Sequence, residues 1–315
     1  MAPTNPDVTT SAPEMNKKAR AKLAKDTINI LIPNILKTND RARAGVSASK
    51  LIDYDQSLVP AKLQRHPSAP PSQSQPAPEP TPKHPPASPK IRVIKSDTFD
   101  AAQSLLTSNP SRKVKIAVLN MASPLRPGGG VLNGARTQEE SLCLRSTLYA
   151  TLHNTFYRLP ELSAVYSPDV LVFRSPDNAE LPKKDWFYVD IISCAALRFP
   201  ETIVREVKGE DGDVAVMEKA YENDSQREAA TCKARTIVQA AAQNGVTHLV
   251  LGALGCGAYG NPPGEVARIF KRVLCGNRRR AGVTVEGSGI EEILFAIFDE
   301  GENLRVFEEV FAGCE

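Results

Sequence analysis

The sequence has few of the residues that build metal centres and disulfide frameworks. Its 315 residues include 4 histidines and 6 cysteines, and no two cysteines form a C-x-x-C pair. The cysteines are scattered along the chain, at Cys143, Cys194, Cys232, Cys256, Cys275 and Cys314. A zinc site and a disulfide framework are therefore both disfavoured, and free thiols are typical of a reducing compartment. We expect an intracellular protein with no metal and no cofactor.

Long hydrophobic runs and a strong net charge are absent as well. No stretch is long enough to cross a bilayer, and the start of the chain lacks the apolar core of a secretory signal. The net charge of +3 gives no field that would draw the protein onto nucleic acid, although it suits a small anionic ligand. We expect a soluble monomer that binds neither DNA nor a membrane directly.

Proline is unevenly distributed, and its distribution divides the chain. Residues 57–90 are rich in Pro, Ser and Gln and contain His66 and His84, which are therefore poor candidates for catalysis. Such a segment buries too little apolar surface to order itself, so we interpret it as a disordered insert, with a docking tract for a Pro-binding module as the alternative. Around it we expect a disordered tail at 1–13, a helical extension at 14–56 that packs on the main domain, and a folded domain at 91–315.

Beyond the insert, apolar runs of strand length alternate with helical patterns. Strands are predicted at 114–120, 170–173, 186–192, 248–252 and 290–298, and helices at 141–153, at 214–244 as one helix or two, and at 263–275. This alternation predicts a layered α/β domain. In such sheets, ligands bind at the carboxyl ends of the strands, and both glycine-rich loops of the chain follow predicted strands.

The first glycine-rich loop combines a glycine triplet with two carboxylates. Gly128, Gly129 and Gly130 let the backbone approach a ligand closely, and Glu139 and Glu140 follow just downstream. Glycine triplets also occur in plain turns, and glutamates at a helix start can simply complement the helix dipole. The dipole explanation does not account for the glycines, so the combination indicates acid/base chemistry beside a ligand cradle.

The second glycine-rich loop spans residues 252–264 and links a strand to a helix. Its backbone N–H groups and the following helix start form a natural diphosphate site, although the spacing fits neither the dinucleotide fingerprint nor a P-loop. Tyr259 could stack on a sugar or fill the core of the loop. We interpret Cys256 as a small loop residue rather than a nucleophile, and His248 as a buried packing residue. Together, the two loops predict a pocket for a sugar-bearing diphosphate and proton transfer at a glycosidic bond.

Longer stretches of the chain resemble the microbial-type poly(ADP-ribose) glycohydrolases. The matching segments are 119–124, Pro127 with the glycine triplet, 138–142, Arg145-Ser146, 166–170, 172–174, 189–192, 252–261 and 295–299. The leading helix is also similar, so the resemblance covers about residues 15–55 and 91–312. It implies a three-layer α/β/α macrodomain-like fold with a mixed central sheet and an N-terminal helical extension.

The resemblance also implies roles for the first loop. Glu140 would be the catalytic acid/base that protonates the leaving ribose oxygen and then deprotonates the attacking water. Glu139 would hold the distal ribose hydroxyls, and Gln138 would brace the loop or contact the ribose. Asn120 would face the distal ribose. The glycines 128–130 would line the distal ribose and the diphosphate.

The second loop and the C-terminal strand would bind the rest of the ligand. The residues implied to wrap the diphosphate are Gly255, Cys256, Gly257, Ala258 and Tyr259. Phe298 is the candidate for adenine stacking. The chain departs from the family pattern at Ala253-Leu254, where an aromatic is common, and at Tyr259, where phenylalanine is usual. These departures bear on substrate preference and leave the glutamates intact.

The implied activity is hydrolysis of ribose–ribose bonds in poly(ADP-ribose), from chain ends, in the nucleus or the cytoplasm. Two alternatives stay open. One is a hydrolase of O-acetyl-ADP-ribose or of mono-ADP-ribose on protein, and the other is a macrodomain that binds ADP-ribose without cleaving it. The paired glutamates argue against the second alternative, because a binding module needs no carboxylates beside the distal ribose.

Overall fold

The computed structural model describes residues 15–55, 89–110, 112–207, 216–276, 289–299 and 301–314. The predicted tail at 1–13 and nearly all of the predicted insert at 57–90, with His66 and His84, lie outside these ranges. No helix in the described part of the chain is long and apolar enough to cross a membrane.

A seven-stranded mixed sheet forms the centre of the molecule, in the order β1-β4-β5-β3-β8-β9-β2. Its strands are β1 (Lys50–Ile52), β2 (Lys90–Lys95), β3 (Ile116–Met121), β4 (Ala164–Val172), β5 (Phe187–Cys194), β8 (His248–Leu251) and β9 (Glu292–Ile297). The strands from β5 to β2 are parallel to one another, whereas β4 is antiparallel to both β5 and β1. The predicted strands are confirmed, with shifts at their ends.

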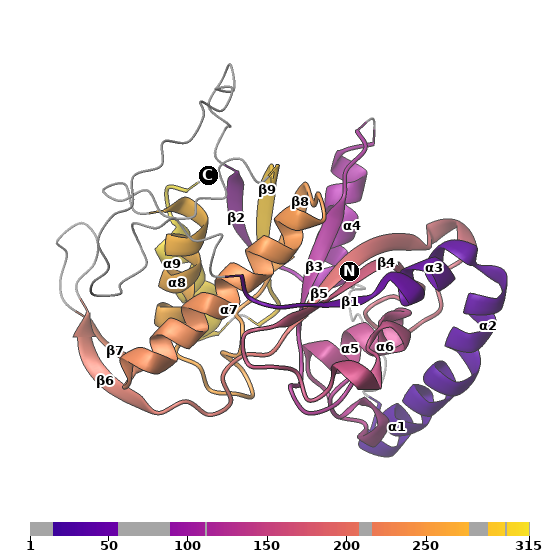
Figure 1. Ribbon diagram of the computed structural model, residues 1–315, viewed down its shortest axis with the longest axis horizontal. Helices are drawn as coiled ribbons and strands as arrows, with labels where there is room; N and C mark the ends of the chain where they lie inside the picture. Colours follow the sequence, from indigo (N-terminus) through magenta and orange to yellow (C-terminus); the bar gives the residue numbers. More distant parts are fainter. Residues whose placement is uncertain are drawn as a thin grey trace, which may run out of the picture.

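Helices cover both faces of the sheet, which explains why the central strands are apolar on both sides. One face carries α7 (Asp224–Gln243), α8 (Pro263–Cys275) and α9 (Glu302–Phe311), which share one buried cluster with the sheet. The other carries α4 (Thr98–Ser108), α5 (Gln138–Arg145) and α6 (Leu148–Thr151), which share a second. Figure 1 shows the two helical layers on opposite sides of the strands. The predicted three-layer α/β/α fold is confirmed.

The N-terminal segment packs against the first glycine-rich loop. It consists of α1 (Lys17–Asp26), the π-helical turn η1 (Thr27–Leu31), α2 (Ile32–Thr38), α3 (Asp40–Ala48) and the strand β1, which the sequence did not predict. Arg20 Nε donates to the carbonyl of Gly134, 3.0 Å away, at the end of the short helix η4 (Val131–Asn133). Gly134 has φ +69°, and a Cβ there would lie 2.2 Å from the Lys17 carbonyl, so this approach requires glycine.

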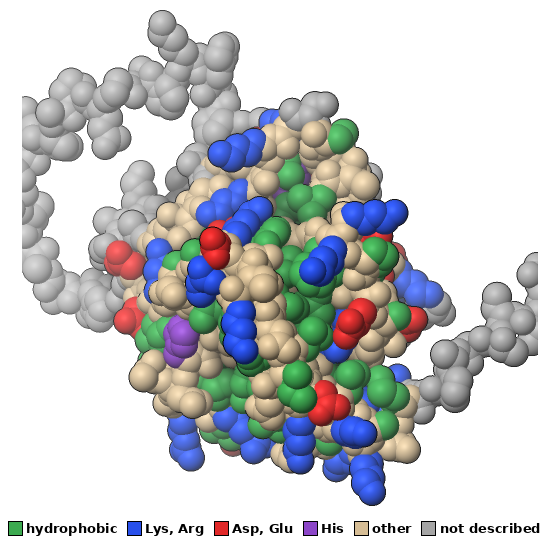
Figure 2. Space-filling view, turned by 90° about the vertical axis from the view of Figure 1, so that its right-hand side faces the viewer, with side chains coloured by type: hydrophobic (Ala, Val, Ile, Leu, Met, Phe, Trp, Pro, Cys, Tyr) green, Lys and Arg blue, Asp and Glu red, His purple; other side chains and the backbone are tan. Residues whose placement is uncertain are grey.

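Lys and Arg side chains are spread over the face of the molecule where these N-terminal helices lie (Figure 2). They do not gather into one basic stripe on that face, in keeping with the net charge of only +3. The remaining short helices are η5 (Asn154–Phe156) and η6 (Lys183–Asp185).

Two predicted helices are wrong in extent because strand pairing overrides helix propensity. The helix predicted at 141–153 begins earlier, at Gln138, and breaks after Arg145, because Ser146 forms a bridge with Val172. Thr147 Oγ1 also accepts a hydrogen bond of 3.0 Å from Leu171 N. The start of the segment 214–244 is likewise a strand, β7 (Val216–Tyr221), which pairs with β6 (Thr202–Val207) in a separate hairpin.

Candidate active site

The two glycine-rich loops lie next to each other because the strands that precede them are neighbours. β3 and β8 run parallel and pair along Ile116–Val118. The first loop follows β3 and leads into α5, whereas the second follows β8 and leads into α8. Parallel strands present their carboxyl ends at one edge of a sheet, so both loops meet there, as the sequence predicts.

Glu139 is held inside the first loop. Its side chain is 2% exposed, and its Oε2 accepts a hydrogen bond of 2.7 Å from the backbone N–H of Ser123. Burial and, to a lesser extent, the charge of Glu140 raise the pKa of Glu139 to about 8, against the lowering effect of the Ser123 N–H. Glu139 therefore keeps its proton near neutral pH.

Glu140 closes a capping box at the start of α5. Its Oε2 accepts from the backbone N–H of Thr137 at 2.9 Å and from the Thr137 hydroxyl. In return, the Thr137 side chain accepts from the backbone N–H of Glu140, which caps the helix N-terminus. Its Oε1 accepts from the N–H of Gly130 at 2.7 Å. The carboxylate that was predicted to act as acid/base is therefore fixed by both the glycine triplet and the helix start.

The middle glycine of the triplet is required by the glutamates themselves. Gly128 and Gly129 have φ values of +62° and +56°, which side chains rarely adopt. A Cβ on Gly129 would lie 2.7 Å from Glu140 Oε1 and 2.8 Å from Glu139 Oε2. Both carboxyls therefore point at the backbone of Gly129, and the sequence analysis, which assigned the glycines to a ligand, did not anticipate this contact.

Gln138 braces the loop against β3, one of the two roles predicted for it. Its Nε2 donates to the Leu119 carbonyl at 2.7 Å and to Thr98 Oγ1 at 3.2 Å. Its Oε1 accepts from the backbone N–H of Met121 at 2.9 Å. Both ends of the amide are thus engaged by protein, and a contact with a ribose stays a prediction.

Asn120 has a free acceptor beside the glutamates. It is fully buried at the end of β3, and its Nδ2 donates to Ser193 Oγ at 2.9 Å and, more weakly, to Glu139 Oε1 at 3.5 Å. Its Oδ1 has no hydrogen-bond partner among the described residues. Because a buried acceptor without a donor is costly, a ligand hydroxyl at this position would be stabilised.

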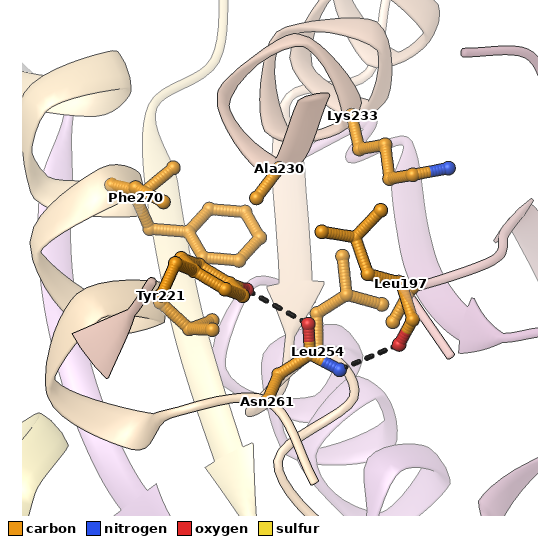
Figure 3. A pocket seen from close by; sticks show the side chains of 10 residues that line it. Leu197, Tyr221, Ala230, Lys233, Leu254, Asn261 and Phe270 are labelled. Atoms are coloured by element: carbon orange, nitrogen blue, oxygen red, sulfur yellow. Dashed lines mark hydrogen bonds between the residues drawn. The ribbon is translucent and has the colours of Figure 1, made fainter. Parts of the chain in front are cut away.

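The second loop is shaped by Asn261. Its Nδ2 donates to the Leu197 carbonyl at 2.7 Å, and its Oδ1 accepts from the Tyr221 hydroxyl at 2.8 Å (Figure 3). Gly255, with φ +76°, passes so close that a Cβ would lie 2.5 Å from Asn261 Nδ2. At Gly257, in contrast, a Cβ would meet nothing within 4 Å, so this part of the backbone is open for a ligand.

The side chains of the second loop differ in environment. Burial raises the pKa of the Cys256 thiol well above its usual range, which opposes thiolate formation and supports its interpretation as a loop residue. The thiol itself is buried although the residue as a whole is half-buried. Burial also raises the pKa of Tyr259, whose neighbours include Arg198, Glu139 and Ser123. Tyr259 therefore connects the second loop to the first.

The three other residues singled out from the sequence lie in or beside the sheet and in the second loop. Phe298 follows β9 at the same edge of the sheet and is 76% exposed, so its ring is available for stacking. His248 is 2% exposed within β8, and burial lowers its pKa, as for a packing residue. Ala258 lies in the turn between Gly257 and Tyr259.

Three further residues around Tyr259 were not predicted from the sequence. Ser123 supplies the backbone N–H that holds Glu139. The Arg198 guanidinium lies 5.7 Å from the centre of the Tyr259 ring, and the Phe199 ring lies 6.1 Å from it. Arg198 and Phe199 follow β5, where no glycine or carboxylate marks a site, so only the adjacency of β5 and β3 reveals them.

Comparisons with known proteins agree with this geometry. The family profile described as "Microbial-type PARG, catalytic domain" (PARG is poly(ADP-ribose) glycohydrolase) matches residues 54–175, which include the first loop and both glutamates. No curated protein matches the chain. The resemblance to the microbial-type PARGs is confirmed.

Solved PARG structures extend the likeness to the whole fold. The PARG of Thermomonospora curvata superposes with a TM-score of 0.67 at 23% identity, over 93% of this chain and 100% of that one. Its structure bound to the inhibitor ADP-HPD gives a TM-score of 0.64 at 23% identity, over 93% and 99%. The PARG of Deinococcus radiodurans in complex with ADP-ribose gives 0.57 at 26% identity, over 86% and 97%. The second glycine-rich loop, which the family profile does not reach, lies within a PARG fold.

Proposed function

We propose that this protein hydrolyses the ribose–ribose O-glycosidic bonds of poly(ADP-ribose) from chain ends and releases ADP-ribose. The observation that carries the proposal is the pair of buried carboxyls at the glycine triplet, of which Glu139 has its pKa raised to about 8. A carboxyl held at a fixed position is what general acid catalysis at a glycosidic bond needs, and both oxygens of Glu140 are fixed by hydrogen bonds. The PARG fold around this pair supports the same substrate.

In the proposed cycle, Glu140 donates a proton to the leaving ribose oxygen as the distal anomeric carbon becomes oxocarbenium-like. The glycosidic C–O bond breaks, and a water then attacks that carbon. Glu140 takes the proton that this water loses and returns to its starting state. Glu139 and Asn120 would hold the hydroxyls of the distal ribose, the latter through its unpartnered Oδ1.

The rest of the terminal unit would lie along the second loop. The open backbone at Gly257 and the start of α8 suit a diphosphate, because unpaired N–H groups and the helix dipole both attract anions. Tyr259 would close over the diphosphate, and the exposed ring of Phe298 would stack on adenine. The ligand would thus run from the end of β3 to the end of β9.

The test is release of ADP-ribose from purified poly(ADP-ribose) in the presence of EDTA, with O-acetyl-ADP-ribose and mono-ADP-ribosylated protein as parallel substrates. We expect release of ADP-ribose from the polymer at a rate that EDTA does not change, since the proposed mechanism uses no metal. Turnover that EDTA abolishes would contradict the mechanism. Turnover of only O-acetyl-ADP-ribose or mono-ADP-ribosylated protein would contradict the assigned reaction. Binding of ADP-ribose without any turnover would contradict it as well.

A further inference from the structure

A hollow lies beside the candidate active site, at the end of β5. It has a volume of about 240 Å³ and is lined by Pro124, Leu159, Pro160, Glu161, Ala195, Ala196, Leu197, Arg198 and Lys233. Pro124 directly follows Ser123, whose backbone N–H holds Glu139. The hollow is therefore close to the glutamates, but the residues predicted to bind ADP-ribose do not line it.

A buried cation points into this hollow. Lys233 on α7 is 4% exposed, and Figure 3 shows its side chain directed away from Tyr221 and Phe270. Its Nζ donates to the backbone carbonyl of Glu161. Within the described ranges, no carboxylate lies within 4.0 Å of this Nζ, although buried lysines are normally paired. An anion in the hollow would supply the negative charge that Lys233 Nζ otherwise lacks.

Arg198 adds a second cation at the rim. It is exposed, and no carboxylate in the described part of the chain forms an ion pair with it. Its guanidinium lies 5.8 Å from the centre of the Phe199 ring and 5.7 Å from that of Tyr259. A planar guanidinium of this kind suits recognition of a phosphate group. The Glu161 side chain is exposed, so its carboxylate has access to solvent rather than being confined with the two cations.

The order of strands places the hollow on one particular side of the glutamates. From the glutamates after β3, the second loop after β8 and Phe298 after β9 lie in one direction along the sheet, and the hollow after β5 lies in the other. If the terminal ADP-ribose unit occupies the β8–β9 side, the scissile bond lies at the glutamates. The unit on the leaving side of that bond then extends toward β5.

We propose that this hollow is a subsite for a phosphate group of the ADP-ribose unit on the leaving side of the scissile bond, held by Lys233 and Arg198. The inference rests on the proposed function and names the part of the polymer that the protein recognises beyond the terminal unit. The volume of the hollow is below the ~300–1,000 Å³ of pockets that enclose a whole small ligand, so the hollow fits a phosphate-bearing part of that unit. A subsite of this kind predicts that the protein binds polymer in preference to single ADP-ribose units.

The test compares binding of an ADP-ribose oligomer with binding of monomeric ADP-ribose, each by equilibrium titration in a Glu140→Gln background that prevents cleavage. Arg198→Ala and Lys233→Met are each added to this background. Arg305→Ala, at an exposed position of α9, is the matched control. We expect the oligomer affinity to fall about tenfold in each subsite variant, the size of a lost charge-assisted contact, while the monomer affinity stays within about twofold. Because Arg198 is exposed, we expect Arg198→Ala to fold even if Lys233→Met does not.

Equal binding of oligomer and monomer by the parent protein would overturn the subsite. So would an unchanged oligomer affinity in Arg198→Ala, or a loss matched by Arg305→Ala. Because these readouts are equilibrium affinities, they are distinct from the turnover assay of the proposed function. If the Glu140→Gln parent binds the oligomer more tightly than the monomer, but the wild-type protein releases no ADP-ribose, the proposed hydrolysis is overturned and the subsite is supported.

Discussion

The two glycine-rich loops use glycine for different purposes. In the first loop, Gly129 makes room for the carboxyls of Glu139 and Glu140, and the loop is tied to β3 and α5 by short hydrogen bonds. In the second, Gly255 makes room for Asn261, whereas the backbone at Gly257 and Gly260 faces open space. The first loop is organised around its own acidic groups, whereas part of the second leaves its backbone open.

This difference separates chemistry from recognition. A general acid must be held at a fixed position relative to the bond it protonates, and every oxygen of Glu140 has a donor in the protein. A diphosphate is bound by unpaired N–H groups, which must face solvent until the ligand arrives. Substitutions in the first loop should therefore affect turnover, and substitutions in the second should affect affinity.

The sharpest test of the comparison is one added methyl group in each loop. Gly129→Ala places a Cβ 2.7 Å from Glu140 Oε1 on a backbone with φ +56°, so the carboxyls must move. We expect turnover to fall about a hundredfold, because a displacement of about 1 Å has this effect on catalysis. Gly257→Ala is the control, because its Cβ meets nothing within 4 Å. Its turnover at saturating polymer should stay within about threefold of the wild-type value. Equal losses in both variants would show that the loops do not differ in this way.

The proton on the carboxyl pair should appear in the pH dependence of stability. The pKa of Glu139 is raised from 4.5 to about 8, so the folded protein retains a proton that the unfolded chain loses between these values. The stabilising contribution of the protonated carboxyl is complete below pH 4.5 and is lost as pH rises through about 8, with a magnitude on the order of a few kcal/mol.

Glu139→Gln removes this titration and should flatten the decline of the unfolding free energy between pH 4.5 and about 8. Urea unfolding of both proteins across this range measures the difference. An identical slope in the wild type and the variant would contradict the raised pKa.

A smaller effect is expected in the second loop, at Tyr259. Its ring lies 5.7 Å from the Arg198 guanidinium, and Tyr259→Ala should weaken ADP-ribose binding about tenfold through lost aromatic contact. Turnover at saturating polymer should change far less than in Gly129→Ala. Tyr259→Phe keeps the ring and should retain wild-type affinity in calorimetric titration. If the phenylalanine variant is as weak as the alanine variant, the hydroxyl rather than the ring makes the contact.

Much of the fold could be predicted from the sequence, because apolar runs such as 116–121 and 292–297 are buried on both faces. The failures have a common cause in strand pairing. Ser146 lies in a helical pattern, yet its backbone pairs with Val172 of β4, and the segment Val216–Tyr221 pairs with β6 in a hairpin. Local propensity does not report such a pairing partner.

The candidate site was predictable where its residues lie together in sequence. Gln138, Glu139 and Glu140 occupy one helix start, and their environment follows from the loop beside it. The contact of Arg198 with Tyr259 depends instead on β5, β3 and β8 being neighbours in the sheet. Lys233 on α7 carries no sequence signal at all, because its importance lies in burial without a carboxylate partner in the described residues.

The central claim is that Glu140 performs the proton transfer, and the variant Glu140→Gln tests it most directly. Gln preserves the shape of the side chain and can still close the capping box, so the fold should be retained. ADP-ribose release from poly(ADP-ribose) and the affinity for ADP-ribose are measured side by side with wild type. We predict a loss of release of about 10³-fold, the size of a general acid's contribution, with affinity within about threefold. Release at a wild-type rate by a folded Glu140→Gln protein would contradict the account.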